Sequence, residues 1–91
     1  MTGVYSLDDM QPCILPGDVA VGFNQVVGNL PGAEYVPVLY VGQQAVAGIN
    51  HMIICRQKIM ASGVQDSLVE VVINHAVTTG TWSLVSISRI A

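Results

Sequence analysis

The side chains of this 91-residue chain that are best suited to catalysis or metal binding are those of two cysteines and two histidines, namely Cys13, Cys55, His51 and His75. A nucleophilic cysteine needs a base such as histidine within hydrogen-bond reach. His51 and Cys55 fall four residues apart in a stretch of strand composition, which separates them by roughly 13 Å along an extended chain. This separation argues against a nucleophilic pair. We therefore interpret Cys55 as a small buried apolar residue and His51 as a packing residue.

The sequence also lacks the spacings that typify metal, acid–base and nucleotide sites. No two of the four residues have metal-ligand spacing, and neither a CxxC nor an HxxxH pattern occurs. The acidic residues are scattered, so no carboxylate pair for acid–base catalysis can be argued. The glycines do not follow a strand as a phosphate-binding loop requires. We expect a protein that is not an enzyme and that carries no metal and no cofactor.

Composition limits the classes of partner. Apolar residues make up 52% of the chain and charged residues 10%, which predicts one ordered domain over residues 1–91 with a modest core. A net charge of −3 gives no basic surface for nucleic acid or for a membrane. Residues 1–9 lack the basic and apolar regions of a signal peptide, so we expect a cytoplasmic protein, with secretion of a longer precursor left open. A disulfide between Cys13 and Cys55 is the less favoured state of these thiols.

A change of apolar period predicts a helix over residues 17–30. Pro16 suits its start, Asp18 suits its first turn, and residues 29–32 would stop it. Because valines and Gly22 are poor helix formers, packing on a sheet would have to hold it. An all-β interpretation of this stretch is the alternative. The residues on its apolar face would be Val19, Phe23, Val26, Val27 and Leu30.

Four strands are predicted after this helix. Pro37 in the first of them indicates an edge position or a bulge. In the second strand, side chains alternate between the two faces of the sheet. Ile53 and Cys55 are therefore expected to point toward the helix, and Met52 and Ile54 to lie on the open face. In the third, Val69, Val71 and Ile73 share one face. The predicted strands cover residues 35–41, 49–59, 67–77 and 82–90.

Helix and strands together predict an α+β domain, with one N-terminal helix packed on a four- to five-stranded antiparallel sheet. Its first hairpin would turn between Gly42 and Gly48, and the tip would be unusually apolar. Loop tips are normally polar, so an apolar tip suggests a surface that another protein covers. Trp82, which follows the last turn, is predicted to be exposed, and exposed tryptophans are enriched at interfaces.

The first hairpin resembles a known family. Residues 44–48, Gln-Ala-Val-Ala-Gly, have the Gln-x-Val-x-Gly form of the cystatins, and Asn50 follows where those proteins often read Gly-Thr-Asn-Tyr. The segment from Tyr35 to Cys55 is similar to small bacterial cystatin-like proteins, and the resemblance extends over residues 3–90. It departs from the family at Gly80-Thr81-Trp82, where cystatins carry a Pro-Trp pair.

The resemblance implies reversible inhibition of papain-like cysteine proteases. A wedge formed by the N-terminal trunk, the first hairpin loop and the second hairpin would fill the protease cleft without any chemistry by the inhibitor. The alternative is a cystatin-fold binding or scaffold module without inhibition. The residues implied to contact the protease are Gly3, Val4, Gln44, Ala45, Val46, Ala47, Gly48 and Trp82.

Two kinds of self-association are also expected. Val46 is β-branched and lies in a tight loop, so its backbone is expected to be strained. Opening that hairpin would exchange the helix and first strand between two chains in a domain-swapped dimer, to which cystatins are prone. Alternatively, Met52 and Ile54 would join two copies through the open face of the sheet.

Overall fold

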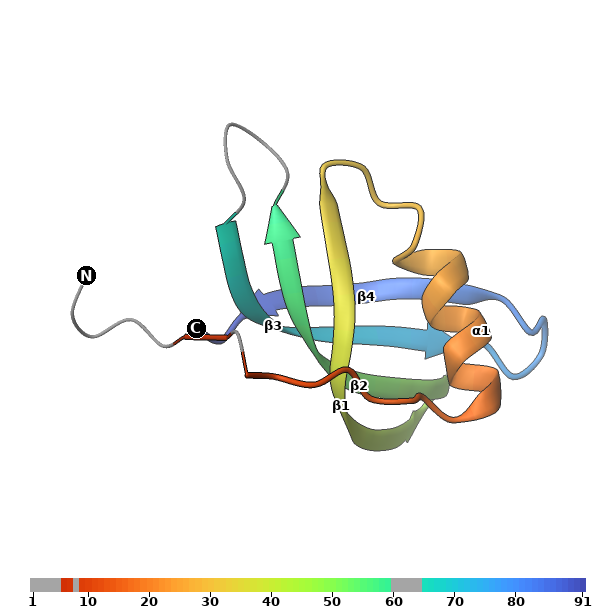
Figure 1. Ribbon diagram of the computed structural model, residues 1–91. Helices are drawn as coiled ribbons and strands as arrows, with labels where there is room; N and C mark the ends of the chain where they lie inside the picture. Colours follow the sequence, from red (N-terminus) through yellow and green to blue (C-terminus); the bar gives the residue numbers. More distant parts are fainter. Residues whose placement is uncertain (1–5, 8, 60–64) are drawn as a thin grey trace.

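A computed structural model describes residues 6–7, 9–59 and 65–91, and one helix lies across one face of a four-stranded antiparallel sheet (Figure 1). The strands follow one another in space as they do in sequence, in the order β1-β2-β3-β4. The predicted α+β class is therefore confirmed. The elements are α1 (Gly17–Val26), β1 (Ala33–Val46), β2 (Gly48–Ile59), β3 (Gln65–His75) and β4 (Trp82–Arg89).

Helix α1 starts as expected and ends early. Pro16 is its N-cap residue, and the helix ends at Val26 instead of Leu30. The backbone N–H of Val27 donates to the carbonyl of Phe23 at 2.8 Å, and residues 27–29 then form a turn. The β-branched Val26 and Val27 and the following Gly28 are poor helix formers, which explains why the helix does not extend further.

The core forms between α1 and the two central strands. Ile53 and Cys55 point inward and are fully buried, as predicted. Val69, Val71 and Ile73, which were predicted to share one face of β3, are buried in the same core. Val26 and Leu30, which were also assigned to the apolar face of the helix, are only partly buried against this core. The buried cluster consists of Leu15, Val19, Phe23, Val27, Ile53, Cys55, Val69, Val71 and Ile73.

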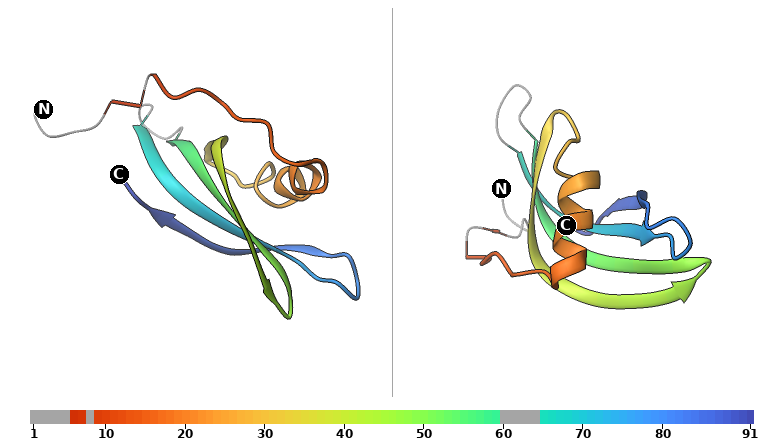
Figure 2. Two further views of the ribbon diagram at one scale, coloured as in Figure 1. Left: turned by 90° about the horizontal axis from the view of Figure 1, so that it is seen from below. Right: turned by 90° about the vertical axis from the view of Figure 1, so that its right-hand side faces the viewer.

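Strand β1 is an edge strand with two irregularities. Its pairing with β2 shifts between Pro37 and Leu39 and again between Tyr40 and Gly42. The prediction of an edge or a bulge at Pro37 is confirmed on both counts. Bulges bend a strand and increase its twist, and the sheet curves around α1 (Figure 2).

Within the described part of the chain, no helix is long and apolar enough to cross a bilayer.

Candidate functional site

The β1–β2 hairpin is tighter than the sequence predicted. Gln44, Ala45 and Val46 are strand residues that pair with Asn50, Ile49 and Gly48. Ala47 is the single residue between the two strands. The expectation of a loop between Gly42 and Gly48 is therefore wrong. The chain reverses within one residue because Gly48 adopts a φ of +141°, which residues with a side chain rarely adopt.

Gly48 also brings the two hairpins of the sheet together. A Cβ atom built on Gly48 would lie 2.7 Å from the carbonyl oxygen of His75 and 3.3 Å from Cα of Ala76. His75 is the last residue of β3, and Ala76 begins the turn into β4. Both hairpins therefore turn at the same end of the sheet, away from the C-terminus (Figure 1).

The paired turns expose apolar side chains. Residues 44–47 are all exposed, with half of Val46 accessible to solvent, and Val77 in the second turn is 73% exposed. The second turn is ordered by Gly80, whose N–H donates to the carbonyl of Ala76 at 2.8 Å. We call this surface, made of residues 44–47 and 77–80, the hairpin end. Its apolar side chains are those of Ala45, Val46, Ala47 and Val77, and they are exposed to solvent.

Trp82 does not belong to the hairpin end. Its ring stacks on His75 with centroids 4.0 Å apart and an interplanar angle of 6°. It also lies against the helix, since a Cβ atom built on Gly22 would meet Cδ2 of Trp82 at 2.1 Å. The side chain is therefore only partly accessible, and the predicted exposure at a turn tip is wrong. As the first residue of β4, Trp82 faces α1, and the missing side chain of Gly22 leaves room for the indole.

A row of rings lies beneath the start of α1. The hydroxyl of Tyr40 and Nδ1 of His51 are hydrogen-bonded at 2.8 Å, and the His51 ring lies 5.5 Å from Trp82. The row therefore runs Tyr40, His51, Trp82, His75 across the sheet. His51 is 5% exposed, which agrees with its interpretation as a packing residue. Burial lowers the pKa of His51, and the neighbouring His75 lowers it further.

A cavity of about 610 Å³ lies between this ring row and the first turn of α1. Tyr40, His51 and His75 line its sheet side, and Asp18 lies on its helix side. A helix start attracts anions, but the Asp18 carboxylate already occupies that position in the first turn. Among the described residues, no group of three or more potential ligands could hold a metal ion.

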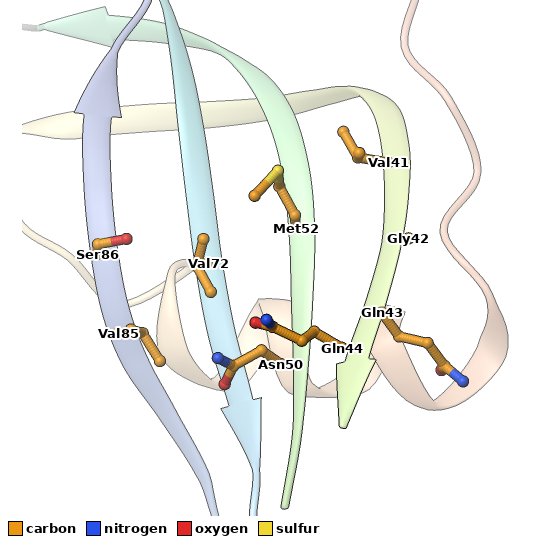
Figure 3. Close-up of a pocket in the computed structure, with 9 residues that line it drawn as sticks. All are labelled: Val41, Gly42, Gln43, Gln44, Asn50, Met52, Val72, Val85 and Ser86. Carbon is orange, nitrogen blue, oxygen red and sulfur yellow. The ribbon is translucent and has the colours of Figure 1, made fainter. Parts of the chain in front are cut away.

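A second hollow, of about 510 Å³, lies on the open face of the sheet beside the hairpin end (Figure 3). Met52 and Val72 from the central strands form its floor, and Val41 and Val85 lie on the two edge strands. Gln44 and Asn50 line it nearest the hairpin, with Asn50 accepting a hydrogen bond from Asn74. Of the two residues expected to form an apolar patch on the open face, Met52 lines this hollow and Ile54 does not.

The two cysteines do not form a reactive centre. Both are free thiols, Cys13 half-buried and Cys55 fully buried. Burial raises the pKa of Cys55 to about 12, with a smaller contribution from Cys13. A thiol with such a pKa is protonated at neutral pH and is a poor nucleophile.

The N-terminal lead-in approaches α1 along the sheet. The N–H of Cys13 donates to the carbonyl of Pro37 at 2.8 Å, and Pro37 pairs with Cys55 in the middle of the β1–β2 ladder. Traced backward from α1, the chain thus leaves the hairpin end. The wedge that the resemblance implies needs the lead-in beside the first hairpin, whereas the described part of the lead-in runs away from it. Gly3 and Val4 themselves lie outside the described residues.

Sequence reasoning thus located the hairpin end but missed the residues that support it. Nothing in the sequence pairs Tyr40 with His51 or stacks His75 on Trp82. One signal was available, since an internal glycine such as Gly22 in a poor helix often marks a close approach by another group. Comparisons of this chain with protein-family models, with curated proteins and with solved structures find no match.

Proposed function

We propose that this chain is a protein-binding module that docks through its hairpin end. Its proposed partner is a papain-like cysteine protease, inhibited reversibly when the hairpin end fills the active-site cleft. The observation that carries the proposal is the contact of Gly48 with His75 and Ala76, since it holds two exposed apolar turns side by side. A convex apolar surface of this kind suits a concave partner.

The proposed inhibition requires no chemistry from this chain. Val46, Ala47 and Val77 would supply apolar contact, and Gln44 with the exposed backbone of the turns would orient the complex. Trp82 would act indirectly. It packs between α1 and His75, the residue before the β3–β4 turn, and so holds that turn in place. This differs from the direct contact that the resemblance implies for Trp82.

A second candidate is a binding module of the same fold without protease inhibition. Two observations favour it. Trp82 is turned toward α1, and the lead-in around Cys13 approaches from the opposite direction. The second hairpin therefore does not present Trp82 as the family's wedge does, and the described part of the lead-in runs away from the hairpin end.

Titration of papain with the purified protein separates the two candidates. Inhibition by wild type at or below about 100 μM, where even binding near −5.5 kcal/mol is detectable, supports the first. Unchanged papain activity at that concentration, with the protein shown to be folded, leaves only the second.

Variants then locate the surface. Val46→Arg, at a side chain that is 50% exposed, is expected to weaken inhibition at least tenfold by placing a charge in the apolar contact. Val21→Arg is the matched control, because Val21 is 55% exposed and lies on α1. Equal loss in both variants would contradict docking through the hairpin end. Gly48→Arg is unsuitable, since a side chain at Gly48 would collide with His75 and disturb the fold itself.

A further inference from the structure

The two edges of the sheet are protected very differently. On β1, Pro37 and two register shifts interrupt the edge, and Glu34 adds a charge. The carbonyl of Pro37 already accepts a hydrogen bond from the N–H of Cys13. Such devices prevent a sheet from pairing with another strand. Strand β4 has one register shift and the charge of Arg89 at its end, and no Asp, Glu, Lys, Arg or Pro occurs between Glu70 and Arg89.

The outer edge of β4 is also unpaired within the described part of the chain. β4 is the last strand of the sheet, and Figure 2 shows it as the outermost one. Among the described residues, no backbone hydrogen bond beyond the β3–β4 ladder involves residues 82–89. Half of Val85 and 39% of Leu84 are accessible to solvent. An eight-residue strand of this character is a template for a further strand.

The side-chain pattern of β4 indicates which strand fits. Trp82, Leu84, Ile87 and Arg89 pair with the inward-facing residues His75, Ile73, Val71 and Val69 of β3 and so share the helix side. Ser83, Ser86 and Ser88 pair with open-face residues, and Val85 lines the open-face hollow. The extra residue Val85, where the β3–β4 register shifts, reverses the alternation halfway along the strand.

Read from either end, the sequence of faces along residues 82–89 is therefore the same. Two antiparallel copies of one strand, related by a two-fold axis, must present the same face at opposing positions. Without the register shift at Val85, a two-fold axis between residues 85 and 86 would place helix-side residues of one copy opposite open-face residues of the other. With it, Leu84 lies opposite Ile87 of the copy on the helix side, and Ser83 opposite Ser88 on the open side.

We propose that β4 pairs antiparallel with β4 of a second copy of this chain, which joins the two sheets into one continuous eight-stranded sheet. Leu84 and Ile87 would extend the two cores across the joint. Arg89, the only charged residue of β4, would face Trp82 of the copy and no like charge. The hairpin ends would remain free, so this association is independent of the proposed inhibition.

An interface of one strand edge is small, so the complex should be weak and in fast exchange. Sedimentation velocity from about 10 μM to about 1 mM, concentrations that span the Kd of a weak complex, should show a dimer that dissociates on dilution. Val85→Lys, which brings two ammonium groups close to the axis, should raise the dimer Kd at least tenfold. Val41→Lys, on the opposite edge and equally exposed at 52%, should leave it unchanged.

The same experiment distinguishes other associations. Loss of the dimer in Val41→Lys or Met52→Lys, with Val85→Lys still dimeric, would show association through the open face and overturn the proposal. A wild type that stays monomeric at about 1 mM, far above the Kd of most specific complexes, would overturn it too.

If Val85→Lys fails to fold, wild-type protein alone decides the question. In an equal mixture of isotope-labelled and unlabelled chains, intermolecular NOEs between the methyl groups of Leu84 and Ile87 are expected. Within one chain these residues share the helix side of the same strand, and the isotope filter removes any NOE between them that is not intermolecular. A dimer that shows other intermolecular contacts and lacks this one would contradict the pairing.

Discussion

Gly48 is the residue on which the hairpin end depends most. Its φ of +141° reverses the chain, and the carbonyl of His75 occupies the space that a side chain would need. We expect Gly48→Ala to lower the free energy of unfolding by about 1–3 kcal/mol, the usual cost of strained backbone. Urea denaturation measures this loss.

Gly17→Ala is the control for Gly48→Ala. Gly17 starts α1 with nothing within 4 Å of a built Cβ atom, and no positive φ occurs there. Alanine is the better helix former, so this change should be neutral or slightly stabilising. Equal effects of the two substitutions would contradict the role assigned to Gly48.

His51 should make stability fall in mildly acidic solution. Its pKa is lowered in the folded protein, first by burial and then by His75, from an ordinary value of 6.5. The unfolded chain therefore takes up a proton at a higher pH than the folded one does. The stabilisation is complete above pH 6.5 and is lost as the pH falls from 6.5 toward the lower folded pKa.

The measurement is the urea-unfolding free energy of wild type and His51→Gln between about pH 7.5 and pH 5.5, the range in which histidine titrates. Glutamine can still accept a hydrogen bond from Tyr40, so the variant should fold. Its stability should depend less on pH than that of wild type. Identical pH slopes would show that the folded state does not hold His51 neutral.

At the scale of elements, α1 depends on one aromatic contact. The helix is rich in valine and contains Gly22, so its propensity is low and packing must hold it in place. Phe23 is 4% exposed within the core cluster. We expect Phe23→Ala to cost about 3–5 kcal/mol, a large part of the total stability of a domain of this size.

Val21→Ala provides the matched comparison for Phe23→Ala. Val21 lies two residues away on α1 and is 55% exposed, so its truncation should change stability by less than about 0.5 kcal/mol. Thermal or urea unfolding of the two variants measures the difference. Similar midpoints would mean that the buried face of α1 does not anchor the helix to the sheet.

How far the sequence predicts these elements depends on the range of the interactions that decide them. Period alone placed Val19 and Phe23 of α1 inward, and alternation did the same for Ile53 and Cys55. The end of α1 was misplaced because apolar period continues to Leu30 after the backbone has left the helix. Boundaries of this kind are decided by local caps and turns more than by the apolar pattern.

The candidate site was predictable only in part for the same reason. An apolar turn with two bracketing glycines is a local signal, and it located the hairpin end. The position of Trp82 depends on its contact with Gly22 of α1, which is distant in sequence, and His75 stacks on the Trp82 ring. A tryptophan beside a turn is exposed or buried according to what lies above it, and here a glycine of the helix leaves the space.

At the scale of the whole molecule, the fold separates three surfaces. The helix side is filled by the core, and the hairpin end exposes apolar side chains at one extremity. The unprotected edge of β4 lies along a different side of the sheet. Docking of a protease at the hairpin end and pairing through β4 are therefore geometrically compatible.

The tight β1–β2 hairpin also predicts a slow, domain-swapped dimer. Opening it into one continuous strand would exchange α1 and β1 between two chains. We expected strain at Val46, but its backbone φ is not positive, and the left-handed conformation is at Gly48 instead. We therefore expect the strain at the reversal itself, where only Ala47 lies between the strands. Short hinge loops of this kind favour swapping, and longer ones suppress it.

Lengthening the loop is therefore the informative change, in place of substituting Val46. Insertion of Asn-Gly after Ala47 would allow a relaxed two-residue turn to form and should lower the dimer fraction after prolonged incubation at least several-fold. The same insertion after Thr79, in the exposed β3–β4 turn, is the control and should leave that fraction unchanged. Size-exclusion chromatography after dilution isolates the swapped form, because a β4-paired dimer dissociates at once. Equal fractions of persistent dimer in all three proteins would show that the β1–β2 hairpin is not the hinge.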